Sequence, residues 1–196
     1  GGLDPIGQFD TEGTAEDVAF SADFPNLLFV ADGENGVQII NFDNPLSPVL
    51  HGSVDTPGYA AKIAVSGNYT YAADADSMQV IDVSTPTLPV KVGSIETLGG
   101  SVDIEVVGDL AYVADSGAGL RIFDVTTPSA PFARGFNDTL TSANAVTIVG
   151  SHAYIADGVS GLQVCDVSDP DNPWIVGGVK SRGLVEAIGV AVAGNL

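Results

Sequence analysis

The sequence predicts an all-β protein, a β-propeller built of four-stranded antiparallel blades. One observation is a phrase ending in Ala-Asp that returns at spacings of 41 or 42 residues, at 29–32, 71–74, 112–115 and 154–157. A second is the alternation of apolar residues with polar or small ones around each phrase. A fixed period of this size is typical of stacked repeats, and a period of two is typical of strands.

Two further landmarks recur in the same order. An Asp-x-Ser/Thr-x-Pro-x-x-Pro segment occupies 82–89, 124–131 and 166–173, and the copy at 41–48 has Asn41 in place of the aspartate. A glycine follows the second proline by four residues, at Gly52, Gly93, Gly135 and Gly177. Three landmarks in constant order indicate one structural unit repeated four times.

Each repeat reads as four short strands. The first contains residues such as Ile63 and Val65, and the turn Ser66–Asn68 joins it to the second. A glycine hairpin such as Asp115–Gly119 leads to the third strand, because glycine readily adopts the positive φ of such turns. The prolines cannot donate to a ladder and mark the sheet edge, and a fourth strand such as Val90–Ile95 follows.

The wording of the repeat resembles the LVIVD-repeat family. Ala111–Asp115 and Gly119–Thr126 match its Ala-Tyr-Val-Ala-Asp and Gly-Leu-x-Ile-x-Asp-Val-Ser stretches, and the resemblance covers almost the whole chain. It implies a propeller from a bacterial or archaeal surface or secreted repeat protein, and little about activity. Function has to be argued from a site, because propellers host many functions.

The chain divides into one propeller segment of four blades and part of a fifth. The predicted bounds are an outer strand at 1–13, blades at 14–54, 55–95, 96–136 and 137–179, and an inner strand at 180–196. We expect a fragment of a larger ring; the alternatives are a five-bladed ring closed by its two ends and completion by another copy of the chain. An unpaired inner strand exposes ladder groups, which soluble proteins avoid.

The composition of the chain limits the classes of partner that it can bind. The 25 acidic and 6 basic residues give a net charge of −19, which repels nucleic acid and anionic lipid. No apolar run is long enough to span a membrane. The single cysteine, Cys165, is predicted to lie in the core. We expect an extracellular or cell-surface location, a protein or surface-glycan partner, and self-association through the open ends as a further possibility.

Most aspartates are predicted to be structural, because a residue that recurs in every blade maintains the blade. They start a hairpin or end the third strand, where side chains accept backbone hydrogen bonds: Asp32, Asp74, Asp115, Asp157, Asp82, Asp124 and Asp166. No cofactor is predicted. Ca²⁺ is the metal left open, although Asp74-Ala75-Asp76 lacks the glutamate and glycine of a calcium loop.

No catalytic residue is predicted, because the sequence holds none of the common nucleophile, zinc or phosphate-loop motifs. Binding candidates come from the loops between an outer strand and the next inner strand, where charges differ between blades: Glu16, Asp17, Tyr59, Lys62, Asp103, Glu105 and Glu186. Arg121, Arg134 and Arg182 are predicted to neutralise neighbouring acids.

The leading hypothesis is a noncatalytic binding or scaffold module of a secreted or cell-surface microbial protein, acting through the variable loops. One alternative is a metal-dependent, lactonase-like hydrolase with a cation at the channel mouth, which requires oxygens from several blades to converge. The other is a structural subunit of a surface layer or filament.

Overall fold

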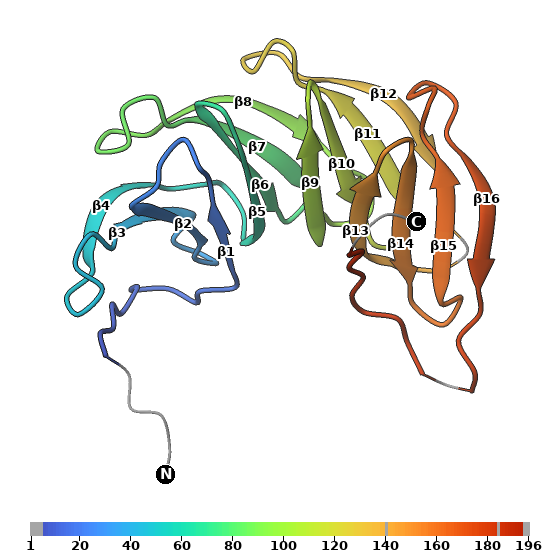
Figure 1. The fold of residues 1–196 in the computed structure, drawn as a ribbon. Helices are drawn as coiled ribbons and strands as arrows, with labels where there is room; N and C mark the ends of the chain where they lie inside the picture. The colour runs from blue at the N-terminus through green and yellow to red at the C-terminus, as the bar shows by residue number, and fades with distance from the viewer. Residues whose placement is uncertain (1–5, 140, 184, 194–196) are drawn as a thin grey trace.

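The computed structural model describes residues 6–139, 141–183 and 185–193, and it confirms the all-β propeller architecture. The described residues form four antiparallel sheets of four strands each, and consecutive strands are neighbours in every sheet. These blades stand side by side along an open arc (Figure 1).

The strands follow one another in the order that the repeats predict. Their bounds are β1 (Asp17–Phe20), β2 (Leu27–Ala31), β3 (Val37–Asn41) and β4 (Val49–Val54) in blade 1; β5 (Ala60–Ser66), β6 (Tyr69–Asp74), β7 (Ser77–Asp82) and β8 (Val90–Glu96) in blade 2; β9 (Asp103–Val107), β10 (Leu110–Ala114), β11 (Leu120–Asp124) and β12 (Phe132–Asn137) in blade 3; and β13 (Ala143–Val149), β14 (His152–Asp157), β15 (Leu162–Asp166) and β16 (Trp174–Val179) in blade 4.

The predicted glycine hairpins connect the second and third strands. In blade 3 the Asp115 N–H donates to the Gly119 carbonyl at 2.8 Å, and Gly119 has a φ of +79°. Gly161 plays the same part in blade 4 with a φ of +80°. A side chain is strained in this conformation, so the recurring glycine follows from the turn.

The hydrophobic core lies between the blades. Three buried clusters each combine one face of a blade with the opposite face of the next, as in the cluster that joins Phe29 and Ile39 of blade 1 to Ile63 and Ile81 of blade 2. Cys165 lies in the cluster between blades 3 and 4, as predicted, and burial raises the pKa of its thiol to about 11. A blade therefore depends on its neighbours for a complete core.

The repeated glycine of the fourth strand is explained by the same contact. A Cβ placed on Gly52, Gly93 or Gly135 would lie 2.2–2.4 Å from a proline carbonyl oxygen of the next blade. These three φ angles are not positive, so the requirement comes from the close approach of the next blade. At Gly177, in the last blade that the structure describes, a Cβ would meet nothing within 4 Å.

The sequence predicts strands at both termini, but within the described residues 6–13, 180–183 and 185–193 no strand forms. Ile6–Asp10 has no strand assignment, yet a Cβ on Gly7 would lie 2.1 Å from the Pro45 carbonyl oxygen, as in the blade-to-blade contacts. Ala187 makes a single bridge with Gly158. Residues 1–5 and 194–196 of the predicted strands lie outside the described residues.

We expect Gly93→Ala to lower the free energy of unfolding by about 1–3 kcal/mol, the usual cost of overpacking, because the added methyl group meets the Pro128 carbonyl. Gly177→Ala is the matched control and should change it by less than about 0.5 kcal/mol. Denaturant unfolding at low protein concentration measures both. Equal effects of the two substitutions would contradict the assigned blade contact.

Candidate functional site

The aspartate of the repeated Ala-Asp phrase ties each blade to the loop that enters it. All four aspartates are at most 1% exposed. Each accepts a backbone N–H from the loop between the preceding outer strand and the blade's own inner strand: Gly13 to Asp32 at 3.1 Å, Gly58 to Asp74 at 3.0 Å, Gly99 to Asp115 at 3.1 Å and Thr141 to Asp157 at 3.1 Å. Each aspartate begins a hairpin and accepts a backbone hydrogen bond, and the donor lies in the loop that enters the blade.

The second set of aspartates forms turns at the end of the third strand. The Asp82 carboxylate accepts the Ser84 N–H at 2.8 Å, and Asp166 accepts the Ser168 N–H at 2.9 Å and its hydroxyl at 2.6 Å. Asp124 makes the same bonds with Thr126. These hydrogen bonds lower the pKa of the three carboxyl groups, and the bond from the side-chain hydroxyl has the largest effect.

The loops between blades share a short sequence pattern, although their charges differ. An acidic residue, a threonine, any residue and a glycine recur as Asp10–Gly13, Asp55–Gly58 and Glu96–Gly99. Thr56 and Thr97 are buried, and Thr56 donates its hydroxyl to Asp74 at 2.9 Å. The first half of each of these three loops is therefore part of the blade, and the recurring Thr-x-Gly spacing is the sequence signal of this role.

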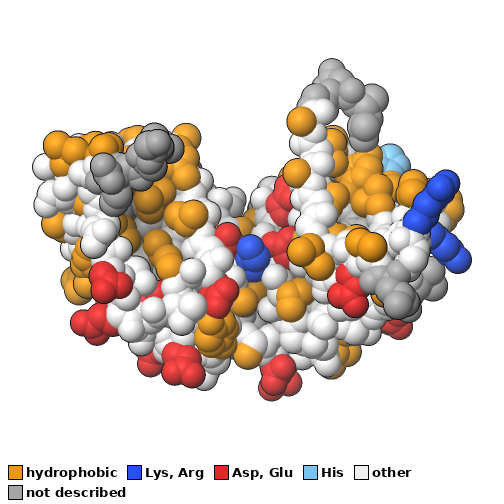
Figure 2. Space-filling model, turned by 90° about the horizontal axis from the view of Figure 1, so that it is seen from below, with side chains coloured by type: hydrophobic (Ala, Val, Ile, Leu, Met, Phe, Trp, Pro, Cys, Tyr) orange, Lys and Arg blue, Asp and Glu red, His pale blue; other side chains and the backbone are white. Residues whose placement is uncertain are grey.

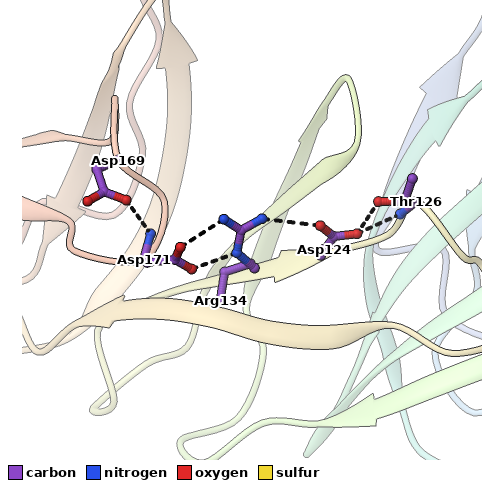
Figure 3. A network of polar contacts seen from close by, with 5 residues as sticks. All are labelled: Asp124, Thr126, Arg134, Asp169 and Asp171. Atoms are coloured by element: carbon purple, nitrogen blue, oxygen red, sulfur yellow. Dashed lines mark hydrogen bonds and ion pairs between the residues drawn. The ribbon is translucent and has the colours of Figure 1, made fainter.

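Arg134 joins blades 3 and 4 at the outer side of the arc (Figure 3). Its guanidinium donates to the two Asp171 oxygens at 2.6 and 2.9 Å and to Asp124 at 3.3 Å. These bonds lower the pKa of the Asp171 carboxyl. Arg121 lies 3.7 Å from Asp115 and 3.2 Å from Asp138. Both arginines neutralise acids, as predicted.

Three of the candidate carboxylates connect neighbouring inner strands. Asp17 accepts the Ile63 N–H of blade 2 at 3.1 Å. Asp103 accepts the Val146 N–H of blade 4 at 2.9 Å, and Glu105 accepts the Ile148 N–H at 3.0 Å. Inner strands have one unpaired edge, so these carboxylates satisfy backbone groups that lack a ladder partner. These three binding candidates are therefore also contacts between blades.

Lys62 lies between two of these carboxylates. The register places Asp17, Lys62 and Asp103 at one position of successive inner strands, each opposite the alanine of the Ala-Asp phrase. The Lys62 ammonium is 3.5 Å from Asp17. Burial raises the pKa of Asp103, while the backbone hydrogen bonds and the charge of Lys62 act in the opposite direction.

Glu16, just before β1, and Tyr59, just before β5, form a separate pair. The Tyr59 hydroxyl donates to Glu16, and this hydrogen bond is the main reason that the pKa of Tyr59 is raised. Tyr59 is 36% exposed, so its ring is accessible from solvent. Glu186 lies next to Ala187, beside blade 4 and at the opposite end of the arc. The structure therefore does not bring it together with the other candidates.

No group of three His, Cys, Asp or Glu side chains is placed to hold a metal ion within residues 6–139, 141–183 and 185–193. These described residues also include no helix that could span a membrane. The inner strands offer three carboxylates that already accept hydrogen bonds, from Asp17, Asp103 and Glu105, and the ammonium group of Lys62. The loops offer the exposed phenol of Tyr59 beside Glu16.

The raised pKa of Asp103 predicts a pH-dependent effect of Asp103→Asn. An aspartate has a pKa near 3.9 when unfolded, so the folded wild type holds this proton more tightly. The resulting stabilisation is present below about pH 4 and is lost as pH rises through the folded pKa. The asparagine keeps an oxygen that can accept the Val146 N–H, and it carries no charge at any pH. The free energy of unfolding of the variant, relative to wild type, should therefore rise as pH increases from about 4 through the folded pKa.

Denaturant unfolding of wild type and variant across about pH 3.5 to 7 measures this difference. Asp23→Asn, at an exposed turn residue, controls for the change in net charge. A difference that falls as pH rises would contradict the assigned burial.

Solved structures of other proteins have a similar fold. A crystal structure of a functionally unknown protein from Desulfotomaculum acetoxidans DSM 771 is similar with a TM-score of 0.78 and 15% identity, over 93% of this chain and 62% of that chain. This chain therefore spans less than two thirds of that protein. The computationally designed Ika4 protein is similar with a TM-score of 0.66 and 11% identity, over 83% of this chain and 97% of that one.

A search of curated proteins by sequence finds no match. The profile of the LVIVD repeat, in contrast, matches four consecutive stretches, at residues 12–56, 57–97, 99–139 and 141–181. Each stretch contains the strands of one blade. The chain belongs to the LVIVD repeat family.

Proposed function

We propose that this chain is a noncatalytic binding or scaffold module of a secreted or cell-surface protein. The observation that carries the proposal is that the carboxylates of the inner strands bind backbone groups of neighbouring blades. Asp17, Asp103 and Glu105 each accept a backbone N–H of a neighbouring blade at 2.9–3.1 Å. An acid or base that acts on a substrate has to reach the substrate's proton, and these groups are engaged in holding strands.

The loops that enter blades 2 and 3 offer the surface for a partner. Tyr59 is 36% exposed and Leu98 is 81% exposed. Glu16, in the loop that enters blade 1, is exposed and accepts the hydrogen bond of Tyr59. Tyrosine is frequent at protein interfaces because one end is apolar and the other forms hydrogen bonds. With a chain charge of −19, a basic protein or peptide surface with apolar residues is the chemistry that fits.

We expect purified protein to show no turnover of ester, lactone or glycoside substrates, with or without added Ca²⁺ or Zn²⁺. Chromogenic substrates followed over hours measure this. The proposal fails if turnover is found and is lost in Glu105→Gln while the variant unfolds at the wild-type denaturant concentration.

We expect binding to basic, apolar peptides on an array, weakened roughly tenfold or more by Tyr59→Ala, as for an aromatic interface anchor. Leu88→Ala is the control, because Leu88 is 73% exposed in the β7–β8 connection, at the other end of the blade. Titration of the best peptide by fluorescence anisotropy measures both. Equal affinities of the Tyr59 and Leu88 variants would overturn the assigned surface.

The proposed location has its own test. Antibody raised against the chain should label intact cells of the source organism, and labelling only after cell lysis would contradict a surface position.

A further inference from the structure

Two segments of the chain have the sequence that N-linked glycosylation requires, an asparagine followed two residues later by a threonine. They are residues 68–70, Asn-Tyr-Thr, in blade 2 and residues 137–139, Asn-Asp-Thr, in blade 3. Such triplets also arise by chance, so the triplet alone does not identify a modified residue. The repeat helps to distinguish the two cases, because each position can be compared with the same position in the other blades.

Asn68 lies in a two-residue turn that leaves its side chain free. Ser66 and Tyr69 pair across the turn, and Gly67 has a φ of +55°. The Asn68 carbonyl accepts the Val83 N–H at 2.8 Å, while the residue is exposed and its side chain makes no hydrogen bond within the described residues. A Cβ on Gly67 would meet nothing within 4 Å, so the space beside the turn is open. The Asn68 amide can therefore carry a bulky group without a change in the fold.

The fold gives no reason for the hydroxyl of Thr70. This residue is fully buried in β6, and its Oγ1 has no hydrogen-bond partner within the described residues. The same position of the other second strands holds apolar residues, namely Leu28, Ala111 and Ala153. A buried hydroxyl without a partner costs free energy, so an apolar residue would suit the folded blade better. Glycosylation, in contrast, requires a hydroxyl at this position of the triplet.

The second triplet differs, because both of its key residues belong to the contact between blades. Thr139 stands at a loop position that holds a threonine in every blade, the others being Thr11, Thr56 and Thr97. Its Oγ1 also lacks a partner within the described residues, but the recurrence shows that the loop uses this residue type. Nδ2 of Asn137 donates to the Pro173 carbonyl of blade 4 at 3.2 Å, and its Oδ1 is buried. A sugar on Nδ2 would disturb this contact.

We propose that Asn68 carries an N-linked glycan and that Asn137 does not. The proposal rests on the secreted or cell-surface location proposed above, because this transfer takes place outside the cytoplasm. In the reaction, Nδ2 of Asn68 forms a bond to the anomeric carbon of a sugar carried on a lipid phosphate. The bond between that carbon and the phosphate oxygen breaks, the lipid phosphate leaves with the electron pair, and one amide proton passes to a base of the transferase.

The modified turn lies away from the surface proposed for binding. Tyr59 precedes β5 and Asn68 follows it, and this strand of seven residues separates them by about 20 Å. In Figure 1 β1 runs upward from the loop that enters it, so the entry loops lie at the lower side of the arc and the turns between first and second strands at its upper side. Figure 2 shows the lower side, where acidic side chains lie on both arms of the arc. A glycan on Asn68 would therefore leave the entry loops open to a partner.

Peptide mapping by mass spectrometry of the protein purified from its source organism tests the proposal. The peptide that contains Asn68 should carry a glycan, and fragmentation should place the glycan on this side chain. The peptides with Asn137 and Asn26 should be unmodified. Asn26 is the matched control, because it is exposed at the same turn position of blade 1, where its carbonyl accepts the Phe42 N–H, but Leu28 stands two residues later.

Variants expressed in the same organism separate the roles of the asparagine and the threonine. Asn68→Gln and Thr70→Val should each abolish the modification, and Thr70→Ser should retain it. Leu28→Thr should create a modified residue at Asn26, because it supplies the missing hydroxyl at an equally exposed turn. Thr70→Val should also raise the denaturant concentration at which the unglycosylated protein unfolds, because it removes an unpartnered buried hydroxyl and keeps the shape of the side chain.

An unmodified Asn68 would overturn the proposal, and antibody labelling of cells then identifies what has failed. Labelling of intact cells would leave the surface location standing and reject the glycan alone, whereas labelling only after lysis would reject both. Equal modification of Asn137, or a modification of Asn68 that survives Thr70→Val, would also overturn the proposal.

Discussion

The hydrogen bond between a buried aspartate and the loop that enters its blade is the contact on which the rest of the arc depends. It places a carboxylate with at most 1% exposure against backbone N–H groups of the connection between two blades. A buried carboxylate is costly unless its oxygens are bonded, so the loop has to adopt the geometry that supplies those donors. Once the loop is set, the next inner strand starts at a defined place, and the apolar faces of the two blades meet.

The fold could be predicted because its contacts repeat. The Ala-Asp phrase, the prolines and the fourth-strand glycine each answer a requirement present in every blade, so they recur at a period that one sequence reveals. The residues that these landmarks contact in the folded chain could not be predicted from the sequence. Nothing near Gly93 in the sequence indicates that it approaches Pro128, since that contact forms only after the blades have stacked.

The candidate site was predicted less well, for a related reason. Charges that differ between blades predict binding residues, and in the structure one of these residues, Asp17, accepts the N–H of Ile63, 46 residues further along the chain. Variation between blades here reflects how each pair of inner strands is joined. Blades 1 and 3 use carboxylates, and blade 2 places Lys62 at the same position, where it faces Asp17. The Tyr59–Glu16 pair was predicted as two residues of one site, and the structure does bring them together.

The same repetition makes the ends of the arc different from its middle. An inner blade contributes two faces to buried clusters, and each end blade contributes one. Stability in such arrays comes from interfaces as well as from the units, so a substitution at one interface weakens both of the blades that share it. Tyr59 belongs to none of the three buried clusters, so its loop can differ from blade to blade without changing the core.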